Sequence, residues 1–173
     1  RGSTALEETG ASLKRHGVRA GGLQEMKHVY LAGPIGGRTQ EEAKGWREDV
    51  SAQIKGHGIA GISPLRCEPG MSVDNVYDRQ GYVDPSFGTA DAIGSKNEFD
   101  VRSCHVVLAY MPFPSHGTDI EIGMARALNK PIILVTEDPD IRGHAVRNYV
   151  CNWILTDLDE AVDLIIGLLG DYK

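Results

Sequence analysis

The chain has 173 residues, of which 41% are hydrophobic and 24% are charged, and its formal net charge is −6. This length predicts one domain with a buried core. Because the balance is acidic and no basic stripe occurs, we expect no polymeric nucleic acid as a partner, and since no apolar segment is long enough to span a membrane, we expect no membrane partner either.

The three cysteines, Cys67, Cys104 and Cys151, bear on compartment and on metal binding. Their number is odd and no C-x-x-C pair occurs, so neither a disulfide scaffold nor a structural zinc site is expected. No H-x-x-H or H-E-x-x-H spacing occurs, which predicts that the protein has no metal site. A reducing, cytoplasmic location fits this cysteine usage best.

The first 25 residues differ in composition from the rest of the chain. They are small, polar and glycine-containing, and they begin with Arg1-Gly2-Ser3, which resembles the remnant of a purification tag. Met26 stands directly before an apolar run. We therefore expect residues 1–25 to be a tag-derived or upstream extension and residues 26–173 to form the domain.

Apolar runs and helical spacing alternate along the domain. They predict strands at 28–33, 59–63, 106–110, 131–136 and 151–155, and helices at 39–55, 90–103, 118–129 and 158–169. The alternation predicts an α/β fold: a single-domain, Rossmann-like or flavodoxin-like, doubly wound, five-stranded parallel sheet with helices on both faces. Ligands of such sheets bind beyond the carboxyl ends of the strands, where the predicted loops are 33–38, 64–90, 111–118 and 137–147.

The first of these loops runs from Gly33 to Arg38 and is rich in glycine. It is not a dinucleotide-binding fingerprint, because G-x-G-x-x-G requires a glycine where Ile35 stands, and it is not a P-loop, because no G-K-[ST] follows. Two interpretations stay open. In the first, the loop is a plain turn from strand to helix. In the second, it lets a sugar or phosphate approach closely, with Arg38 as the counter-charge.

A second glycine turn, from Ser115 to Gly123, follows the predicted strand 106–110 and opens a predicted helix. Such a turn directs backbone N–H groups and the positive end of the helix dipole to one spot, where an anion binds. Glu121 lies about one turn into this helix. Its spacing fits two roles: a capping box with Thr118, or a catalytic carboxylate beside the anion-binding turn.

Three further residues each allow an ordinary and a functional interpretation. Asp100 is either a helix-surface carboxylate or a functional group that donates a proton or binds the base. Tyr30 is either a core aromatic residue or a hydroxyl that reaches the strand-end cleft and orients a carboxylate. His144 lies in the loop after the fourth predicted strand, where a lone histidine is usually solvated.

Four blocks of residues follow one another in a recognisable order. They are Val29-Tyr30-Leu31-Ala32-Gly33-Pro34-Ile35, Asp100 ahead of the strand 106–110, Ser115-x-Gly117-Thr118-x-x-Glu121-Ile122-Gly123-x-Ala125, and Asn129-Lys130-Pro131-Ile132. Together they resemble the nucleoside 2-deoxyribosyltransferase family and its nucleotide N-glycosidase relatives. The resemblance covers most of residues 28–170.

The resemblance implies a mechanism that uses no cofactor. Glu121 attacks the anomeric carbon of the sugar and forms a covalent glycosyl-enzyme intermediate, which another base or water then releases, as in retaining glycosidases. Asp100 assists proton transfer to the leaving base, and Tyr30 holds Glu121 in line. The residues implied to bind the substrate around them are Gly33, Ile35, Gly37, Arg38, Ser115, Gly117 and Thr118.

Ser115 departs from the pattern of one branch of the family. In transferases that act on free deoxynucleosides, the position six before the nucleophile is typically an aspartate that binds the sugar 5′-hydroxyl. The nucleoside 5′-monophosphate hydrolases of the family resemble this chain in having serine there and a Gly-Gly-Arg that ends at the position of Arg38. An aspartate repels a 5′-phosphate, whereas a serine hydroxyl and helix N–H groups bind it, so the sequence favours a nucleotide substrate.

The resemblance also implies a homodimer or a larger homo-oligomer with sites shared between subunits. In this family a residue from the loop after the fourth strand often completes the neighbouring subunit's site. His144 and Asn148 lie where that residue comes from.

Three functions are therefore open. The first is an N-glycosidase that cleaves a ribo- or deoxyribonucleoside 5′-monophosphate to free base and sugar phosphate. The second is a transferase that exchanges bases between deoxynucleosides by the same covalent route. The third is a nucleotide-binding sensor without turnover, which the joint presence of Glu121, Asp100 and Tyr30 disfavours. We expect residues within 66–99 to select the base.

Overall fold

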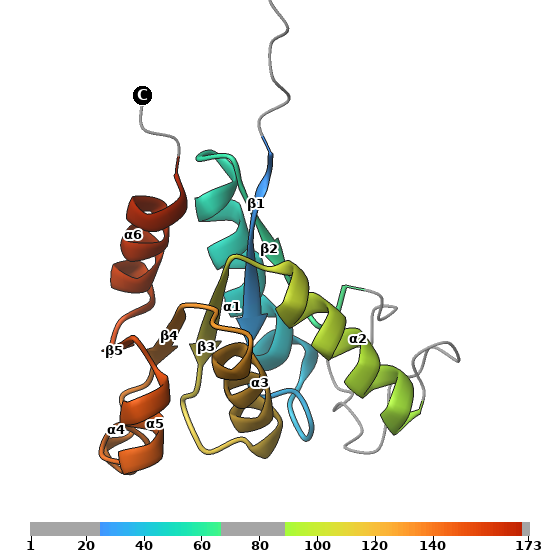
Figure 1. The fold of residues 1–173 in the computed structure, drawn as a ribbon, viewed down its shortest axis with the longest axis vertical. Coiled ribbons are helices and arrows are strands. Elements are labelled where there is room, and N and C mark those ends of the chain that lie inside the picture. The colour runs from blue at the N-terminus through green and yellow to red at the C-terminus, as the bar shows by residue number, and fades with distance from the viewer. Residues whose placement is uncertain (1–24, 67–88, 171–173) are drawn as a thin grey trace, which may run out of the picture.

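The computed structural model describes residues 25–66 and 89–170 (Figure 1). Three sequence-based predictions lie outside these ranges: the extension up to residue 24, the loop over 67–88, and the state of Cys67. The other two cysteines, Cys104 and Cys151, carry free thiols. Burial raises the pKa of each of these thiols to about 11, so neither is a ready nucleophile at neutral pH.

Five parallel strands form one sheet in the described ranges (Figure 1). They are β1 (Lys27–Ala32), β2 (Ile59–Ile62), β3 (Val106–Tyr110), β4 (Ile132–Val135) and β5 (Trp153–Leu155), in the spatial order β2-β1-β3-β4-β5. This is the flavodoxin-like order, so the predicted doubly wound parallel sheet is confirmed. The direction of winding reverses between β1 and β3, and the loops after these two strands diverge there.

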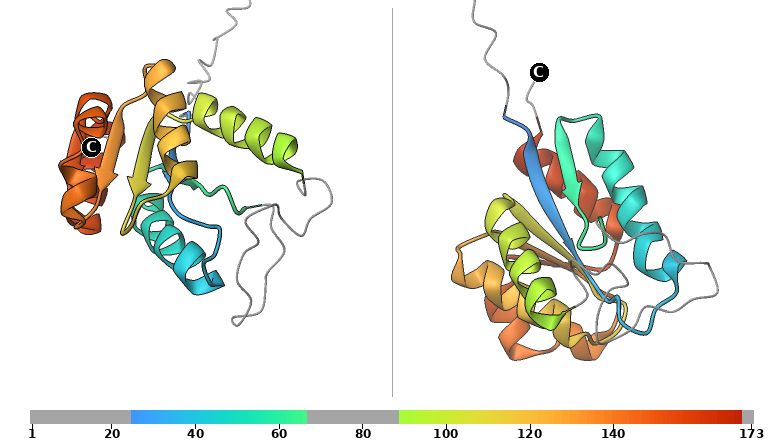
Figure 2. Two further views of the ribbon diagram at one scale, coloured as in Figure 1. Left: turned by 90° about the horizontal axis from the view of Figure 1, so that it is seen from below. Right: turned by 90° about the vertical axis from the view of Figure 1, so that its right-hand side faces the viewer.

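Helices cover both faces of the sheet, as the sequence predicts (Figure 2). α1 (Gln40–Lys55) and α6 (Leu158–Leu169) pack on one face, and α2 (Ala90–Ser103) and α3 (His116–Ala127) pack on the other. Two short helices, α4 (Pro139–Arg142) and α5 (Ala145–Val150), occupy most of the segment that is predicted as a loop between β4 and β5. That prediction is wrong.

Successive side chains of β1 enter two separate cores, because neighbouring residues of a strand point to opposite faces. Val29 and Leu31 belong to the core beneath α1 and α6, whereas Tyr30 and Ala32 belong to the core beneath α2 and α3. All four are fully buried, as expected of a parallel strand that is covered on both faces. The alternation directs the Tyr30 hydroxyl toward α2 and α3.

α3 begins two residues earlier than predicted, at His116, and this changes the role of Thr118. Ser115 is the N-cap residue: its backbone is extended, with φ −142°, and its side chain accepts a hydrogen bond from the backbone N–H of Thr118 at 3.4 Å. Thr118 therefore lies inside the first turn, and the interpretation of Thr118 and Glu121 as a capping box is wrong. The Glu121 carboxylate is available for another role.

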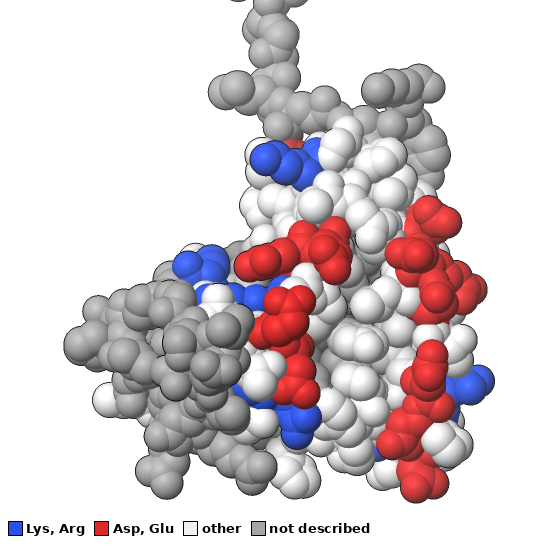
Figure 3. Space-filling view, turned by 180° about the vertical axis from the view of Figure 1, so that it is seen from behind, with Lys and Arg blue, Asp and Glu red and all other residues white. Residues whose placement is uncertain are grey.

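Among the charged side chains on the back of the molecule, where α1 and α6 lie, acidic ones predominate (Figure 3). Both helices begin with acidic residues, Glu41 and Glu42 in α1 and Asp159 and Glu160 in α6, and negative charge stabilises the first turn of a helix. None of the helices in the described part of the chain is both long and apolar enough to cross a membrane.

Candidate active site

A cavity of about 540 Å³ lies at the carboxyl ends of β1 and β3. Open α/β sheets bind their ligands at such a point, where the direction of winding reverses. Three segments line the cavity: the turn after β1 with Gly33, Pro34, Ile35, Gly36 and Arg38; Ile93 and Asn97 of α2; and residues 113–118 with Glu121, which lead from β3 into α3.

Glu121 lines this cavity and is only 6% exposed. One of its oxygens, Oε1, accepts two hydrogen bonds, from the Tyr30 hydroxyl at 2.6 Å and from Nδ2 of Asn97 at 3.0 Å. Within the residues that the structure describes, no group donates to the other oxygen, Oε2. The carboxylate is thus fixed through one oxygen, and the second is left for a ligand.

Burial raises the pKa of Glu121 from 4.5 to about 7, because the ionised form loses its solvation. The hydrogen bond from Tyr30 lowers this pKa, and so do the positive charges of Arg47 and Lys96. The negative charge of Asp100 raises it further. A buried carboxylate with a pKa near neutrality is typical of catalytic groups. Since only the ionised form is nucleophilic, a reaction through Glu121 should accelerate as the pH rises through 7.

Asp100 lies close to Glu121 but does not line the cavity. It is 1% exposed, and its carboxylate accepts hydrogen bonds from both terminal nitrogens of Arg66, one of them at 2.6 Å, and from Nζ of Lys96 at 3.2 Å. Lys96 also donates to the carbonyl oxygen of Pro64 at 2.7 Å. Asp100 is therefore held between two cations, Arg66 and Lys96, outside the lining of the cavity.

The N-terminus of α3 forms the part of the cavity that suits an anion. Ser115, His116, Gly117 and Thr118 all line it. The Thr118 hydroxyl donates to Oγ of Ser115 at 3.0 Å, which leaves the hydroxyl proton of Ser115 to donate to a ligand. First-turn N–H groups and the helix dipole favour negative charge at the same place.

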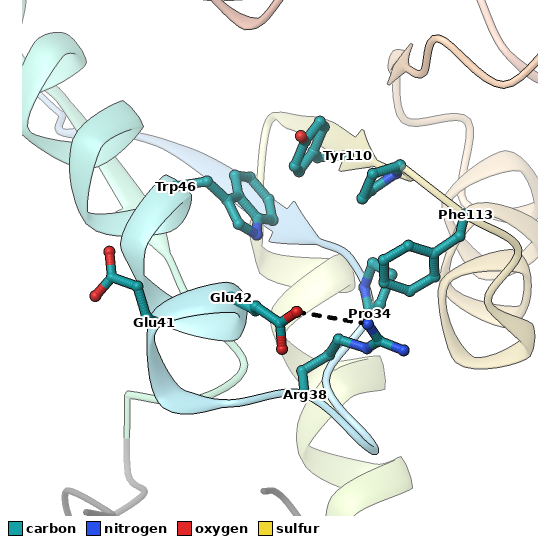
Figure 4. Close-up of a pocket in the computed structure, with 8 residues that line it drawn as sticks. Pro34, Arg38, Glu41, Glu42, Trp46, Tyr110 and Phe113 are labelled. Carbon is teal, nitrogen blue, oxygen red and sulfur yellow. Dashed lines mark ion pairs between the residues drawn. The ribbon is translucent and has the colours of Figure 1, made fainter. Parts of the chain in front are cut away.

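Arg38 lines this cavity and also a second one of about 300 Å³ beside it (Figure 4). Its guanidinium lies 4.1 Å from the centre of the Phe113 ring and pairs with Glu42 at 3.7 Å. Its Nε is buried without a hydrogen-bond partner in the described ranges, so it retains a donor for a ligand. Trp46 and Tyr110 complete the aromatic lining of the second cavity.

The glycines of the first turn have structural reasons of their own. A Cβ atom at Gly33 would lie 2.8 Å from the Trp46 ring and 2.9 Å from the carbonyl oxygen of Tyr110, so only glycine fits. Gly37 has φ 77°, in the left-handed region that favours glycine. Gly33 and Ile35 line the cavity and Gly37 does not, so a substrate contact of Gly37 stays a prediction without support from the cavity.

His144 and Asn148 lie outside this cavity. His144 is the N-cap residue of α5, and Asn148 lines a separate hollow beside α4. An ion pair ties α5 to α3, because Arg147 donates to both carboxylate oxygens of Asp119, at 2.8 and 2.9 Å. The structure therefore does not bring His144 or Asn148 to the active-site cavity of their own chain.

Sequence reasoning missed Asn97, which donates to Glu121, and Phe113, on which Arg38 stacks. A signal for Asn97 exists, because it precedes Asp100 by three residues and so lies on the same side of α2. Nothing comparable marks Phe113, whose contact depends on how the turns after β1 and β3 meet.

A parallel sheet whose strand-end cavity combines a buried carboxylate, a helix N-terminus and an arginine defines an α/β protein with a polar site suited to a small ligand. No group of three or more side chains that could hold a metal ion occurs in the described segments. Residues 29–153 match the family model described as nucleoside 2-deoxyribosyltransferase. The chain belongs to this family, so the family and the enzyme class expected from the sequence are confirmed, and nucleosides or nucleotides fit as its substrates.

Solved structures share the fold across different functions. The CMP N-glycosidase BcmB from Clostridium botulinum is 24% identical, with a TM-score of 0.51 over 83% of this chain and 100% of that chain. A 2-deoxyribosyltransferase from Bacillus psychrosaccharolyticus is 16% identical (TM-score 0.56; 84% and 99%). The molybdenum cofactor carrier protein of Chlamydomonas reinhardtii is 14% identical (TM-score 0.53; 83% and 98%). At these identities the likeness establishes the fold alone. No curated protein sequence matches the chain significantly.

Proposed function

We propose that this protein is a nucleotide N-glycosidase, which hydrolyses a nucleoside 5′-monophosphate to free base and sugar 5-phosphate through Glu121. The observation that carries the proposal is the arrangement of Glu121, whose Oε1 is fixed by Tyr30 and Asn97 while Oε2 has no partner in the described ranges. Ser115 and Arg38 line the same cavity, and they supply the hydroxyl and guanidinium donors that a 5′-phosphate requires.

In the first step, Oε2 of Glu121 bonds to C1′ from the face opposite the base, and the C1′–N bond breaks with its electron pair going to the base. The leaving base takes up a proton. Asp100 is the candidate donor, once its contact with Arg66 or Lys96 has opened. In the second step, water attacks C1′, the ester bond to Glu121 breaks, and the proton that the water loses replaces the one given to the base, so that the donor is restored. One water molecule is consumed for each base released.

A direct assay separates this proposal from the two alternatives. The protein is incubated with CMP, dCMP, dGMP and free deoxynucleosides, with and without an acceptor base, and the products are separated by chromatography. Free base released from a monophosphate without an acceptor supports hydrolysis. A new nucleoside formed only when an acceptor base is present supports base exchange instead. Tight nucleotide binding with no product supports a sensor.

Ser115→Asp should reverse the preference for a phosphorylated substrate. The carboxylate repels a 5′-phosphate, so we expect kcat/KM for the nucleotide to fall on the order of 100-fold, while that for the matching nucleoside holds or rises. Aspartate is a good N-cap residue, so α3 should persist. Ser115→Asn is the matched neutral control, because it caps equally well and should retain most of the nucleotide activity. If kcat/KM falls equally for the nucleotide and the nucleoside, the 5′-phosphate does not bind at Ser115.

Tyr30→Phe should slow the reaction and shift its pH profile. The change removes the hydrogen bond that orients Oε1 and lowers the pKa of Glu121. We expect kcat/KM to fall about 10–100-fold and the acidic limb to move upward by about 0.5–1 pH unit. The substrate phosphate, which titrates near pH 6, is common to both proteins and cannot cause the difference. If the acidic limb of the pH profile does not move, Tyr30 does not lower the pKa of Glu121.

The proposal extends to a homodimer or larger assembly in which His144 and Asn148 complete the partner's site. Two observations support it: Val146 and Tyr149 of α5 are exposed apolar side chains, 62% and 73% exposed, and α5 is fixed against α3 by Arg147. A cytoplasmic location stays a prediction from the cysteine content.

A further inference from the structure

Asn97 carries a polar atom that no neighbour among the described residues satisfies. Its Nδ2 donates to Oε1 of Glu121 at 3.0 Å, while its Oδ1 is buried and has no hydrogen-bond partner among the described residues. Asn97 also lines the active-site cavity. A buried carbonyl oxygen without a donor costs stability, so Oδ1 marks a place where a ligand presents an O–H or N–H group.

The position of Asn97 beside the nucleophile indicates which group that is. Because Nδ2 holds Oε1 of Glu121, Oδ1 belongs to an amide group that lies beside the carboxylate in the lining of the cavity that C1′ would enter. In a β-nucleoside the base projects from one face of the sugar, and a nucleophile that displaces it approaches from the opposite face. In ribose, the 2′-hydroxyl projects from that same opposite face, on the carbon next to C1′. In 2′-deoxyribose this position holds only hydrogen.

We propose that Asn97 is a specificity-determining residue that accepts a hydrogen bond from the 2′-hydroxyl, so that the substrate is a ribonucleoside 5′-monophosphate rather than its deoxy counterpart. The inference rests on the proposed function, and it names the sugar that the proposed function leaves open. A single side chain then serves two purposes, since Nδ2 orients the nucleophile and Oδ1 reads the sugar.

The backbone that carries Asn97 is held on both sides. Lys96, the preceding residue, pairs with Asp100 at 3.2 Å and donates to the carbonyl oxygen of Pro64 at 2.7 Å, and both charged side chains are buried. Asp100 is in turn bound by Arg66. These contacts fix the middle of α2 against the segment after β2. A specificity-determining side chain such as Asn97 discriminates best when the backbone that carries it is rigid.

Two other donors of a nucleotide fit the position less well. An exocyclic amine of the base lies on the opposite face of the sugar from Glu121. The 3′-hydroxyl is one carbon farther from C1′, and it is present in ribose and deoxyribose alike. Each of these makes a different prediction for a change at Asn97, so an experiment separates them.

The test is the ratio of kcat/KM for CMP to that for dCMP, measured on the whole chain for the wild type, Asn97→Ala and Tyr30→Phe, with GMP and dGMP as a second pair. For the wild type we expect ribose to be favoured on the order of ten- to a hundredfold. Asn97→Ala should bring the ratio close to one. Tyr30→Phe removes the other hydrogen bond to the same oxygen of Glu121, so it should slow both sugars equally and keep the wild-type ratio.

Alanine is a stronger helix former than asparagine, so Asn97→Ala should fold, which circular dichroism checks. Asn97→Leu, of similar size, is the second variant. A wild type that favours dCMP or treats both sugars alike overturns the inference and leaves the proposed function standing. A ratio that Asn97→Ala leaves unchanged overturns it too. With UMP assayed alongside CMP, a change in the preference between these two bases in place of the sugar preference also overturns it. Base release from none of these nucleotides overturns the proposed function itself.

Discussion

Glu121→Gln should abolish base release and leave the fold intact. The glutamine keeps an oxygen at the position of Oε1, which still accepts the hydrogen bonds from Tyr30 and Asn97, whereas an amide nitrogen replaces Oε2. A carboxamide cannot form the glycosyl ester, so we expect kcat to fall at least about 10³-fold. Chromatography of the released base and circular dichroism of the variant measure the two effects.

The same substitution should stabilise the protein at alkaline pH. Burial raises the pKa of Glu121 from 4.5 to about 7 in the folded protein, so between these values the native state binds more protons than the unfolded state. The free energy of unfolding of the wild type therefore falls as the pH rises through this window. Glu121→Gln lacks this penalty, and it should be more stable than the wild type at pH 8, by on the order of 1–3 kcal/mol.

At pH 5 the difference in stability should be much smaller, since Glu121 is then largely protonated in the folded protein. Urea unfolding of both proteins at pH 5 and pH 8 gives the two differences. A variant that is less stable than the wild type at pH 8 would show that the Glu121 carboxylate is not a strained, poorly solvated group.

Arg47→Leu should destabilise the whole fold by about 3–5 kcal/mol. The side chain is 1% exposed, and it donates to the carbonyl oxygens of Leu31 at 2.9 Å, of Gly33 at 2.8 Å and of Ala43. It joins the end of β1 and the turn after it to α1, and leucine leaves these buried acceptors unpaired. Thermal or urea unfolding measures the loss.

Two variants control for the loss of an arginine as such. Arg102→Leu removes an arginine that is 60% exposed and paired with Glu98, and a surface pair of this kind contributes at most about 1 kcal/mol. Arg47→Lys keeps the charge but lacks the fork of donors, so its loss should be intermediate. If Arg47→Leu is no worse than Arg102→Leu, then Arg47 does not hold the β1 turn.

The fold could be predicted where the sequence pattern is long and regular. The helix 158–169 has the predicted bounds, because an amphipathic pattern follows a single capping residue, Asp157. The start of α3 could not be fixed in the same way, since Ser115 and Thr118 are both good caps and only the extended backbone of Ser115 decides between them. α4 and α5 are too short to show periodicity, although Pro139 after Asp138 is a helix-start signal.

The candidate site could be predicted only where the type of a single residue and its position in the sequence indicate its chemistry. Ser115 and Arg38 stand in glycine-rich turns at strand ends, and Glu121 lies in the helix that the second turn opens. The parallel sheet brings these segments into one cavity. Partners depend on tertiary packing, which the sequence does not display. The ion pair of Asp100 with Arg66 and the hydrogen bond from Asn97 to Glu121 are of this kind, since they join side chains 34 and 24 residues apart.

The most direct test of a covalent route through Glu121 is intact-protein mass spectrometry after incubation with a 2′-fluoro nucleoside 5′-monophosphate. The fluorine destabilises the oxocarbenium-like transition state and slows turnover of the intermediate. We predict an added mass equal to one fluorinated sugar phosphate, located on the peptide that contains Glu121 and absent from Glu121→Gln. Base release without any adduct, or an adduct that persists in Glu121→Gln, would contradict the role of Glu121 as nucleophile.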